Sequence, residues 1–461
     1  FVKGKAGSPY AICDYYDINP YLADNPEDRI DEFKDLIKRI HEAGLKVIID
    51  FVPNHVARDY GMISPEECHP MLGREDDKSV HWKEENDFIY YPGCELKLPT
   101  ACPKGMEPYH EMPAMATGNN CYSAEPGIND WFETVKINYC DFHTPTWDKM
   151  LDIVKYWASM GIDGFRCDMV ELVPAEFMKW LIAEVKKEYP AVIFIAEVYK
   201  KELYNEYVRN VGFDFLYDKS GLYDTLRTIV EKNTDDNGMP VELWQSTMGI
   251  TRSWQFLGDL QPYMLNFLEN HDEQRFASDF FGKSAGNTFA PLHVSMLLNT
   301  APFMIYFGEE VGEKGMDEEG FSGRDGRTTI FDYWTVDTIR RWRNGGKFDG
   351  KQLTKDEKKL QGFYATLLNL CNKEKAIREG VFFDLTYANL EGVVFNEHKQ
   401  YAFFRKAGKD LIFIVVNFDD KPAAPCVQIP THAVDYLGIP FKDSYKAKII
   451  LFFFKLFLII F

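Results

Sequence analysis

The sequence predicts a parallel α/β fold followed by a smaller β domain. Short apolar segments alternate with amphipathic helical segments over about residues 7–375, which is typical of a parallel sheet covered by helices. Carboxylates stand at the carboxyl ends of several apolar segments, where a closed (β/α)8 barrel places its active site. No glycine-rich phosphate loop follows any of these segments. We therefore favour a (β/α)8, TIM-type barrel over an open, doubly wound sheet.

The composition is that of a folded globular protein with a strongly acidic surface. Of 461 residues, 46% are hydrophobic and 15% aromatic, and 71 Asp and Glu against 52 Lys and Arg give a formal net charge of −19. Such a negative field repels nucleic acids and anionic membranes but leaves neutral substrates such as sugars unaffected. We therefore expect neither a nucleic-acid partner nor a membrane partner.

The two ends of the chain carry little targeting information. Residues 1–5 lack the apolar core of a signal peptide, so the cellular compartment stays open. Residues 449–461 are almost wholly apolar, but the run is too short to span a membrane. We expect a terminal strand or an atypical tail there.

The first regular elements lie between residues 25 and 55. Asn25 is a good N-cap, Pro26 suits the first helical position, and Gly44 follows the last apolar residue of the helical pattern. The next segment, 47–52, is apolar almost throughout and predicts a parallel strand covered on both faces. It ends at Pro53-Asn54-His55.

Residues 56–130 interrupt the alternation. They contain Gly, Pro, scattered aromatics and four cysteines, with no sustained period, and they are too long for an ordinary connection. We expect an inserted domain here. Cys68, Cys94, Cys102 and Cys121 are able to pair, so the redox compartment also stays open.

The alternation then resumes and continues to about residue 375. We expect helices at 144–161, 174–185, 223–232, 292–298 and 356–373, and strands at 162–168, 191–197, 212–217, 263–272 and 302–310. Beyond 375 the apolar period becomes two, as in 401–405 and 411–417, which indicates a β domain. The predicted domains are a barrel at 1–55 and 131–375, an inserted domain at 56–130, and a C-terminal β domain at 376–461.

Four predicted strands end in a carboxylate: Asp50, Asp168, Glu197 and Asp272. Arg166 precedes Asp168 by two positions, so both side chains project from the same face of a strand. A guanidinium there favours the ionised carboxylate that a nucleophile needs. The alternative is a structural Arg–Asp pair that closes the strand.

Carboxylates around one cleft, without a Cys/His metal set, suit cleavage of a glycosidic bond. Asp168 is the expected nucleophile. Glu197 follows an apolar run, 194–196, that should raise its pKa and suit it to protonate the leaving oxygen. Asp272 is the expected stabiliser of the transition state. The alternatives are a rim ion pair for Glu197 and a satisfied strand-end histidine for His271.

The sequence resembles the α-amylase family of retaining glycoside hydrolases, glycoside hydrolase family 13. The matching motifs occur in the family's order: Ser8-Pro9-Tyr10 through Asp14-Tyr15, Asp50-Phe51-Val52-Pro53-Asn54-His55, Gly164-Phe165-Arg166-Cys167-Asp168, Ala196-Glu197, Asn270-His271-Asp272, Ala301-Pro302 through Tyr306-Phe307-Gly308-Glu309-Glu310, and Gly326-Arg327-Thr328-Thr329. They cover roughly residues 7–335. Together, in this order and at the spacing of barrel units, they are far more specific than any one of them.

The resemblance implies a role for each matching residue. Asp168, Glu197 and Asp272 take the catalytic roles given above. His55 and His271 are implied to hydrogen-bond hydroxyls of the sugar, Arg166 to orient the nucleophile, and Tyr15 to stack under the sugar ring. The substrate implied is an α-glucan or maltooligosaccharide, and the region 56–130 matches the family's inserted domain.

Several features depart from the family's pattern. The family's first two barrel strands precede the Ser8 motif, so we expect six barrel strands here and poor folding of the chain by itself. Glu171-Leu172 stands where many members have Lys-His, so contacts with substrate beyond the cleavage point should differ. Ala11 replaces an Asp that exo-acting members tend to have, which favours internal cleavage.

The sequence also departs from the family at the position of its calcium site. The family often binds calcium through the first-motif asparagine, here Asn54, and an Asp of the inserted domain. Lys136 stands at that Asp position, and its ammonium is able to replace the charge of the metal. We therefore expect no required cofactor and no calcium.

Two other functions remain open at this point. A transglycosylase or isomerase would use the same residues while excluding water. A carbohydrate-binding protein on an inactive enzyme fold would not need Asp168, Glu197 and Asp272 together, and their joint presence favours an enzyme.

Overall fold

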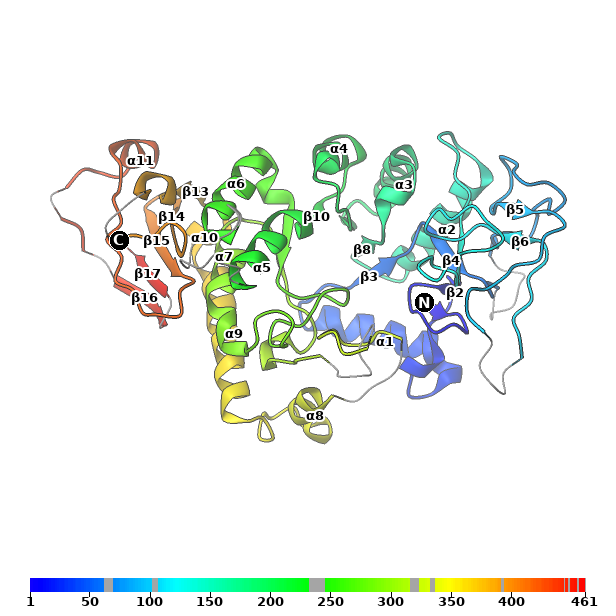
Figure 1. The fold of residues 1–461 in the computed structure, drawn as a ribbon, viewed down its shortest axis with the longest axis horizontal. Helices are drawn as coiled ribbons and strands as arrows, with labels where there is room; N and C mark the ends of the chain where they lie inside the picture. The colour runs from blue at the N-terminus through cyan, green and yellow to red at the C-terminus, as the bar shows by residue number, and fades with distance from the viewer. Residues whose placement is uncertain are drawn as a thin grey trace. The chain divides into compact units, whose positions relative to one another are not determined.

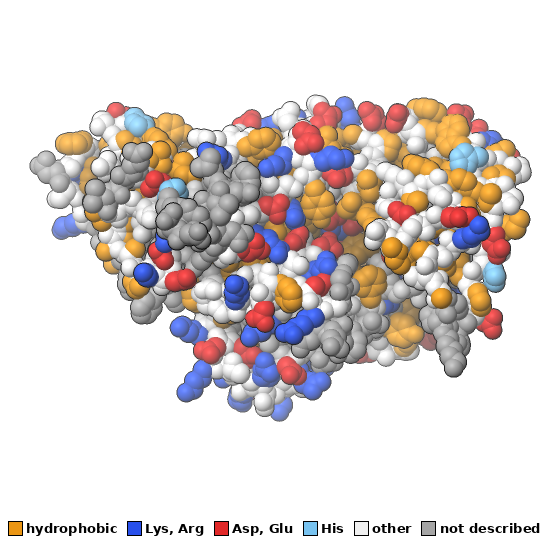
Figure 2. Space-filling view, viewed as in Figure 1, with side chains coloured by type: hydrophobic (Ala, Val, Ile, Leu, Met, Phe, Trp, Pro, Cys, Tyr) orange, Lys and Arg blue, Asp and Glu red, His pale blue; other side chains and the backbone are white. Residues whose placement is uncertain are grey.

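In the computed structural model the chain forms two compact units, Phe1–Tyr217 and Asp218–Phe461 (Figure 1). The structure describes all residues except 62–68, 102–106, 232–244, 316–322, 332–335, 391–393, 443, 447, 454–455 and 461. Among the described residues, no helix combines the length and apolar character that crossing a membrane requires. Figure 2 shows acidic and basic side chains interspersed over one face.

The first unit contains four parallel strands in the order β10-β9-β8-β3. They are β3 (Ile48–Phe51), β8 (Gly164–Cys167), β9 (Ile193–Ala196) and β10 (Phe215–Tyr217). Phe51 pairs with Cys167, and Cys167 pairs with Ala196. Asp168 and Glu197 directly follow two paired residues, so this register places them side by side at the carboxyl edge of the sheet.

Helices alternate with these strands along the chain, as the sequence predicts. The helices of the first unit are η1 (Pro20–Leu22), η2 (Pro26–Asp28), α1 (Arg29–Glu42), α2 (Pro145–Ser159), η3 (Val170–Leu172), α3 (Ala175–Glu188), η4 (Lys201–Leu203), α4 (Tyr204–Glu206) and η5 (Tyr207–Val211). The side chain of Asn25 accepts the N–H of Glu27, which confirms Asn25 as a cap. Gly44 follows α1 at a φ of +75°, a conformation that glycine adopts without strain.

One expectation about β3 is wrong. The apolar run 47–52 predicted a strand covered on both faces, but Ile48 is 41% exposed. The reason is the position of β3 at the end of the strand order, where one side has no neighbouring strand in the described structure.

The region 56–130 is largely irregular, with short antiparallel ladders. Its strands, with those at its margins, are β4 (His55–Ala57), β5 (Tyr90–Tyr91), β6 (Ala114–Met115) and β7 (Thr134–Lys136), and a small ladder of β1 (Val2–Lys3) and β2 (Ile12–Asp14) precedes them. β4 pairs with β7, so the ladder brings the two ends of the region together. Cys94 and Cys121 carry free thiols, whereas Cys68 and Cys102 lie outside the described residues.

The second unit begins with helices around two parallel strands, β11 (Met264–Phe267) and β12 (Phe303–Met304). Its helices are η6 (Lys219–Tyr223), α5 (Asp224–Glu231), α6 (Met248–Leu257), η8 (Gly258–Tyr263), η9 (Ala285–Thr288), α7 (Phe289–Leu297), η10 (Glu309–Val311), α8 (Asp337–Arg343), η11 (Asn344–Gly346), α9 (Lys355–Lys373) and α10 (Lys375–Arg378). Thr354 and Glu357 form a capping box that starts α9.

An antiparallel sheet ends the chain, as the period of two predicts. Its order is β13-β14-β15-β17-β16, with β13 (Val381–Asp384), β14 (Gln400–Ala407), β15 (Asp410–Asn417), β16 (Lys448–Phe453) and β17 (Leu456–Ile460). Two short helices, η12 (Thr386–Asn389) and α11 (Thr431–Tyr436), accompany it. The apolar tail therefore forms strands of this sheet, as one of the two sequence interpretations expected.

Candidate active site

Arg166 is the centre of a cluster of carboxylates in the first unit. Its Nη1 donates to Asp168 Oδ1 at 2.7 Å and to Asp50 Oδ1 at 3.0 Å. Its Nη2 lies 2.9 Å from Glu197 Oε1, in an ion pair that lacks the geometry of a directed hydrogen bond. The cluster thus joins side chains from β3 and from the ends of β8 and β9.

The strand register explains this convergence. Asp50 pairs with Arg166 across β3 and β8, and Asp168 and Glu197 follow the next paired positions. Asp168 is 6% exposed and Glu197 2%, whereas the Asp50 side chain is half exposed. Two buried carboxylates therefore share one guanidinium, and interactions between charges are strong in such a site because water is largely excluded.

Two opposing effects act on the pKa of Asp168, and the sequence indicated only one of them. Burial raises the pKa of Asp168 well above its usual range, and the Arg166 guanidinium acts in the opposite direction. The sequence indicated the nearby guanidinium of Arg166. It did not indicate the burial of Asp168, because burial is a property of the tertiary structure. Asp168 consequently depends on Arg166 for its ionised form.

Glu197 is held by two groups that the sequence did not reveal. The backbone N–H of Met169 donates to Glu197 Oε2 at 2.9 Å, and the Tyr199 hydroxyl donates to Glu197 Oε1 at 2.6 Å. Met169 has a φ of +45°, which is uncommon for a residue with a side chain. Tyr199 lies two positions after Glu197, the spacing of side chains on the same face of a strand, and this spacing is a sequence signal for it. No sequence signal identifies Met169.

The predicted sugar-binding residues of the first unit are buried. Burial, with a smaller contribution from the nearby Lys136 ammonium, lowers the pKa of His55 to about 3, so the imidazole is neutral at physiological pH. The Tyr15 hydroxyl donates to the Val52 carbonyl at 2.6 Å, and its ring packs edge-on against Phe1. The sugar contacts of His55 and Tyr15 stay predictions.

The ammonium group of Lys136 occupies the position at which the family resemblance places a calcium ion. Lys136 Nζ donates to the side-chain oxygen of Asn54 and to the Leu172 carbonyl at 2.7 Å. Burial lowers the pKa of Lys136 to about 7, so the charged form dominates below neutral pH. These residues do not fit a calcium site, because a cation already contacts the oxygens that would bind the metal.

Asp272 and His271 belong to the second unit. His271 Nε2 lies 3.1 Å from Asp272 Oδ2, and the Asn270 side chain accepts the backbone N–H of Asp272 at 2.9 Å. The backbone carbonyl of Asp272 accepts from Arg327 at 3.3 Å. The turn after β11 thus has a defined hydrogen-bonded form that orients Asp272.

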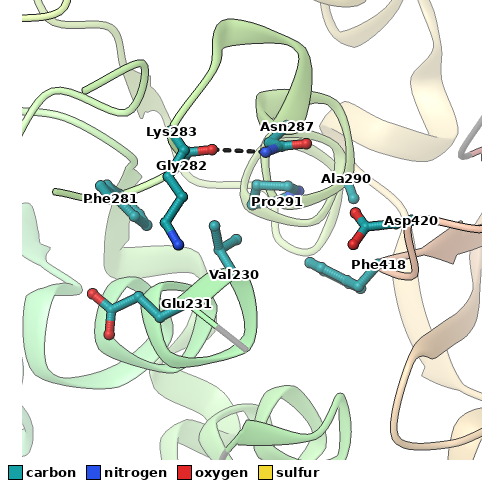
Figure 3. Close-up of a pocket in the computed structure, with 10 residues that line it drawn as sticks. All are labelled: Val230, Glu231, Phe281, Gly282, Lys283, Asn287, Ala290, Pro291, Phe418 and Asp420. Atoms are coloured by element: carbon teal, nitrogen blue, oxygen red, sulfur yellow. Dashed lines mark hydrogen bonds between the residues drawn. The ribbon is translucent and has the colours of Figure 1, made fainter. Parts of the chain in front are cut away.

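The second unit also contains a pocket of about 320 Å³. Phe281, Pro291 and Phe418 contribute apolar walls, and the Asn287 side chain donates to the Gly282 carbonyl at 2.7 Å (Figure 3). None of the predicted site residues lines this pocket, and we assign it no role.

The fold and the site together define a class of protein: an α/β enzyme whose acidic groups lie at the carboxyl ends of parallel strands. The family model described as "Alpha amylase, catalytic domain" matches residues 1–380. The chain therefore belongs to the alpha-amylase family, glycoside hydrolase family 13, as the sequence motifs indicated.

Two curated relatives illustrate the similarity. Alpha-amylase 3 of Dictyoglomus thermophilum is 25% identical over 386 residues, which cover 80% of this chain and 68% of the relative. A cyclomaltodextrinase from a Bacillus species is 23% identical over 418 residues, which cover 90% of this chain and 61% of the relative. The chain thus spans about two thirds of the length of these relatives.

Solved structures show the same fold. A debranching enzyme of Nostoc punctiforme superposes with a TM-score of 0.61 at 17% identity. The superposition covers all of this chain and 82% of the chain of that enzyme. An Anoxybacillus alpha-amylase gives 0.59 at 21% identity, covering 91% of this chain and 74% of its own. The neighbours are (β/α)8-barrel enzymes, which confirms the barrel prediction over the open sheet.

Proposed function

We propose that the protein is a retaining glycoside hydrolase that cleaves α-glucosidic bonds in starch-like glucans or maltooligosaccharides. The observation that supports this most strongly is the sharing of Arg166 by Asp168 and Glu197. Two carboxylates bound to one guanidinium lie only a few ångström apart. Retaining glycosidases space their carboxylates by about 5 Å, whereas inverting enzymes need room for a water between them.

The proposed reaction uses both carboxylates in two steps. Asp168 attacks the anomeric carbon while Glu197 protonates the departing glycosidic oxygen, which leaves a glycosyl ester on Asp168. Glu197 then accepts a proton from water, and this water attacks the ester and releases the sugar with its original anomeric configuration. Arg166 supports the ionised nucleophile, and Asp272 stabilises the positive charge that develops on the sugar.

The test is a Glu197→Gln variant, assayed on starch, pullulan and short maltooligosaccharides. We expect turnover to fall at least ~100-fold, because general acid–base catalysis contributes about that much or more, while maltooligosaccharide binding persists. Glu42→Gln, at an exposed position near the end of α1, is the matched control. Full sugar release by Glu197→Gln would refute the role of Glu197.

Transfer to another sugar is the second candidate. Relatives of this chain include a cyclomaltodextrin glucanotransferase from Geobacillus stearothermophilus, 27% identical over 307 residues. The same Asp168 ester would then react with a sugar hydroxyl in place of water. Products longer than the starting maltooligosaccharide would favour transfer, and products that are all shorter would favour hydrolysis.

We also propose that the enzyme needs no calcium ion. The contacts of Lys136 with Asn54 and Leu172 support this proposal, because the ammonium joins β7, at the margin of the inserted region, to the loop after β8. A metal ion would have to displace this buried side chain from both oxygens.

A further inference from the structure

We propose that Tyr199 and Glu171 are positioning residues for Glu197, through hydrogen bonds that join the loop after β8 to the loop after β9. The proposal deepens the proposed function and rests on it, because it concerns the group that protonates the leaving oxygen. The sequence motifs did not include Tyr199, and they connected Glu171 only with contacts to substrate beyond the cleavage point.

The two loops bind each other in both directions. From the loop after β8, the Met169 N–H donates to Glu197, and Glu171 Oε2 accepts the backbone N–H groups of Tyr199 at 3.3 Å and Lys200 at 3.2 Å. From the loop after β9, the Tyr199 side chain turns back and donates its hydroxyl to Glu197 at 2.6 Å. Glu171 therefore fixes the backbone that carries the Tyr199 hydroxyl.

The chemistry of residue 171 matters for this arrangement. A carboxylate accepts hydrogen bonds, whereas the ammonium of a lysine only donates them. A lysine at this position would be unable to receive the N–H groups of residues 199 and 200.

The Tyr199 hydroxyl has a direct consequence for proton transfer. Glu197 becomes a carboxylate as it gives its proton to the leaving oxygen, and a donor that contacts it stabilises the charge that develops. Removing the donor should therefore slow this proton transfer. A hydrogen bond to a charged group contributes enough that its loss changes a rate by about 10-fold or more. The effect should be confined to reactions in which the leaving group needs a proton.

The experiment compares Tyr199→Phe with the unmodified enzyme on two substrates. For a maltooligosaccharide we expect kcat/KM to fall about 10-fold. For α-maltosyl fluoride, which loses fluoride without protonation, kcat/KM should change less than about 2-fold. Tyr21→Phe, at a tyrosine that is 79% exposed, controls for hydroxyl removal.

Equal losses on both substrates would overturn the proposal, because a purely structural defect affects both reactions alike. Two variants of Glu171 test the other half. Glu171→Gln keeps an oxygen acceptor and should stay within about 2-fold of the unmodified enzyme, whereas Glu171→Ala should reproduce the pattern of Tyr199→Phe.

Equal losses in Glu171→Gln and Glu171→Ala would overturn the role of Glu171 as an acceptor. Glu197→Gln, measured in parallel, separates this inference from the function on which it rests. If Glu197→Gln stays active, the proposed function fails. If Glu197→Gln is inactive and Tyr199→Phe behaves as the unmodified enzyme, only the present inference fails.

Discussion

At the scale of single residues, burial and charge act against each other around Arg166. Burial raises the pKa of Asp168, and the guanidinium opposes that rise. One cation is shared among Asp50, Asp168 and Glu197. A substitution at Arg166 would therefore leave buried carboxylates without a counter-ion, and the resulting loss would combine catalysis with stability.

His55 provides a prediction that concerns stability alone. Its pKa is about 3 in the folded protein against an ordinary 6.5, chiefly because of burial. Between these pH values the unfolded chain binds a proton at His55 that the folded chain does not, so stability rises with pH in this window and falls as the solution is acidified. The dependence approaches about 1.4 kcal/mol per pH unit.

The measurement is urea unfolding between pH 4 and 6.5. We expect the His55→Gln variant to lose less stability on acidification than the unmodified protein, because glutamine does not titrate. His110→Gln, at an exposed histidine, should leave the slope unchanged. The same slope in His55→Gln and the unmodified protein would contradict the prediction.

At the scale of elements, the β4–β7 ladder closes the irregular region 56–130 and places Lys136 beside Asn54. Lys136 and Asn54 are far apart in the sequence but in direct contact in the structure. Lys136 also attaches β7, at the margin of this region, to the loop after β8 through the Leu172 carbonyl. A charged group thus performs a joining role that a metal ion performs in other proteins.

Calcium dependence tests this role of Lys136. We expect a chelator to leave the melting temperature of the unmodified protein unchanged. Lys136→Asp replaces the ammonium with a carboxylate near two other oxygens, which are ligands of the type that calcium binds, with water completing the set. This variant should melt at a lower temperature in chelator and recover partly when calcium is added, as differential scanning calorimetry would record. A chelator-induced fall in the unmodified protein would refute the proposal.

At the scale of the molecule, the second unit combines parallel strands, helices and an antiparallel sheet. Arg405 on β14 is almost fully buried and donates to the carbonyls of Leu298, Ala376, Ile377 and Gly380. These carbonyls belong to the end of α7 and to the segment around α10. The guanidinium therefore connects the helices of this unit to its C-terminal sheet.

Arg405→Lys should destabilise the second unit, because an ammonium has three donors and lacks the planar geometry that reaches several carbonyls at once. We expect a loss of roughly 2–4 kcal/mol, and earlier proteolysis within the C-terminal sheet. Lys406→Arg, the next residue on β14 and more exposed, is the matched control. An unchanged unfolding profile for Arg405→Lys would contradict this connection.

The sequence by itself determined the alternation of strands and helices, the cap at Asn25, the period-two β domain and the ends of the strands that carry Asp168 and Glu197. These features depend on local periodicity and on the conformational preferences of neighbouring residues. Only the tertiary structure decided that Arg166 is shared, that burial works against the ionisation of Asp168, and that Tyr199 returns to Glu197. These depend on strand register and on solvent exclusion, which arise when segments far apart in the chain pack together.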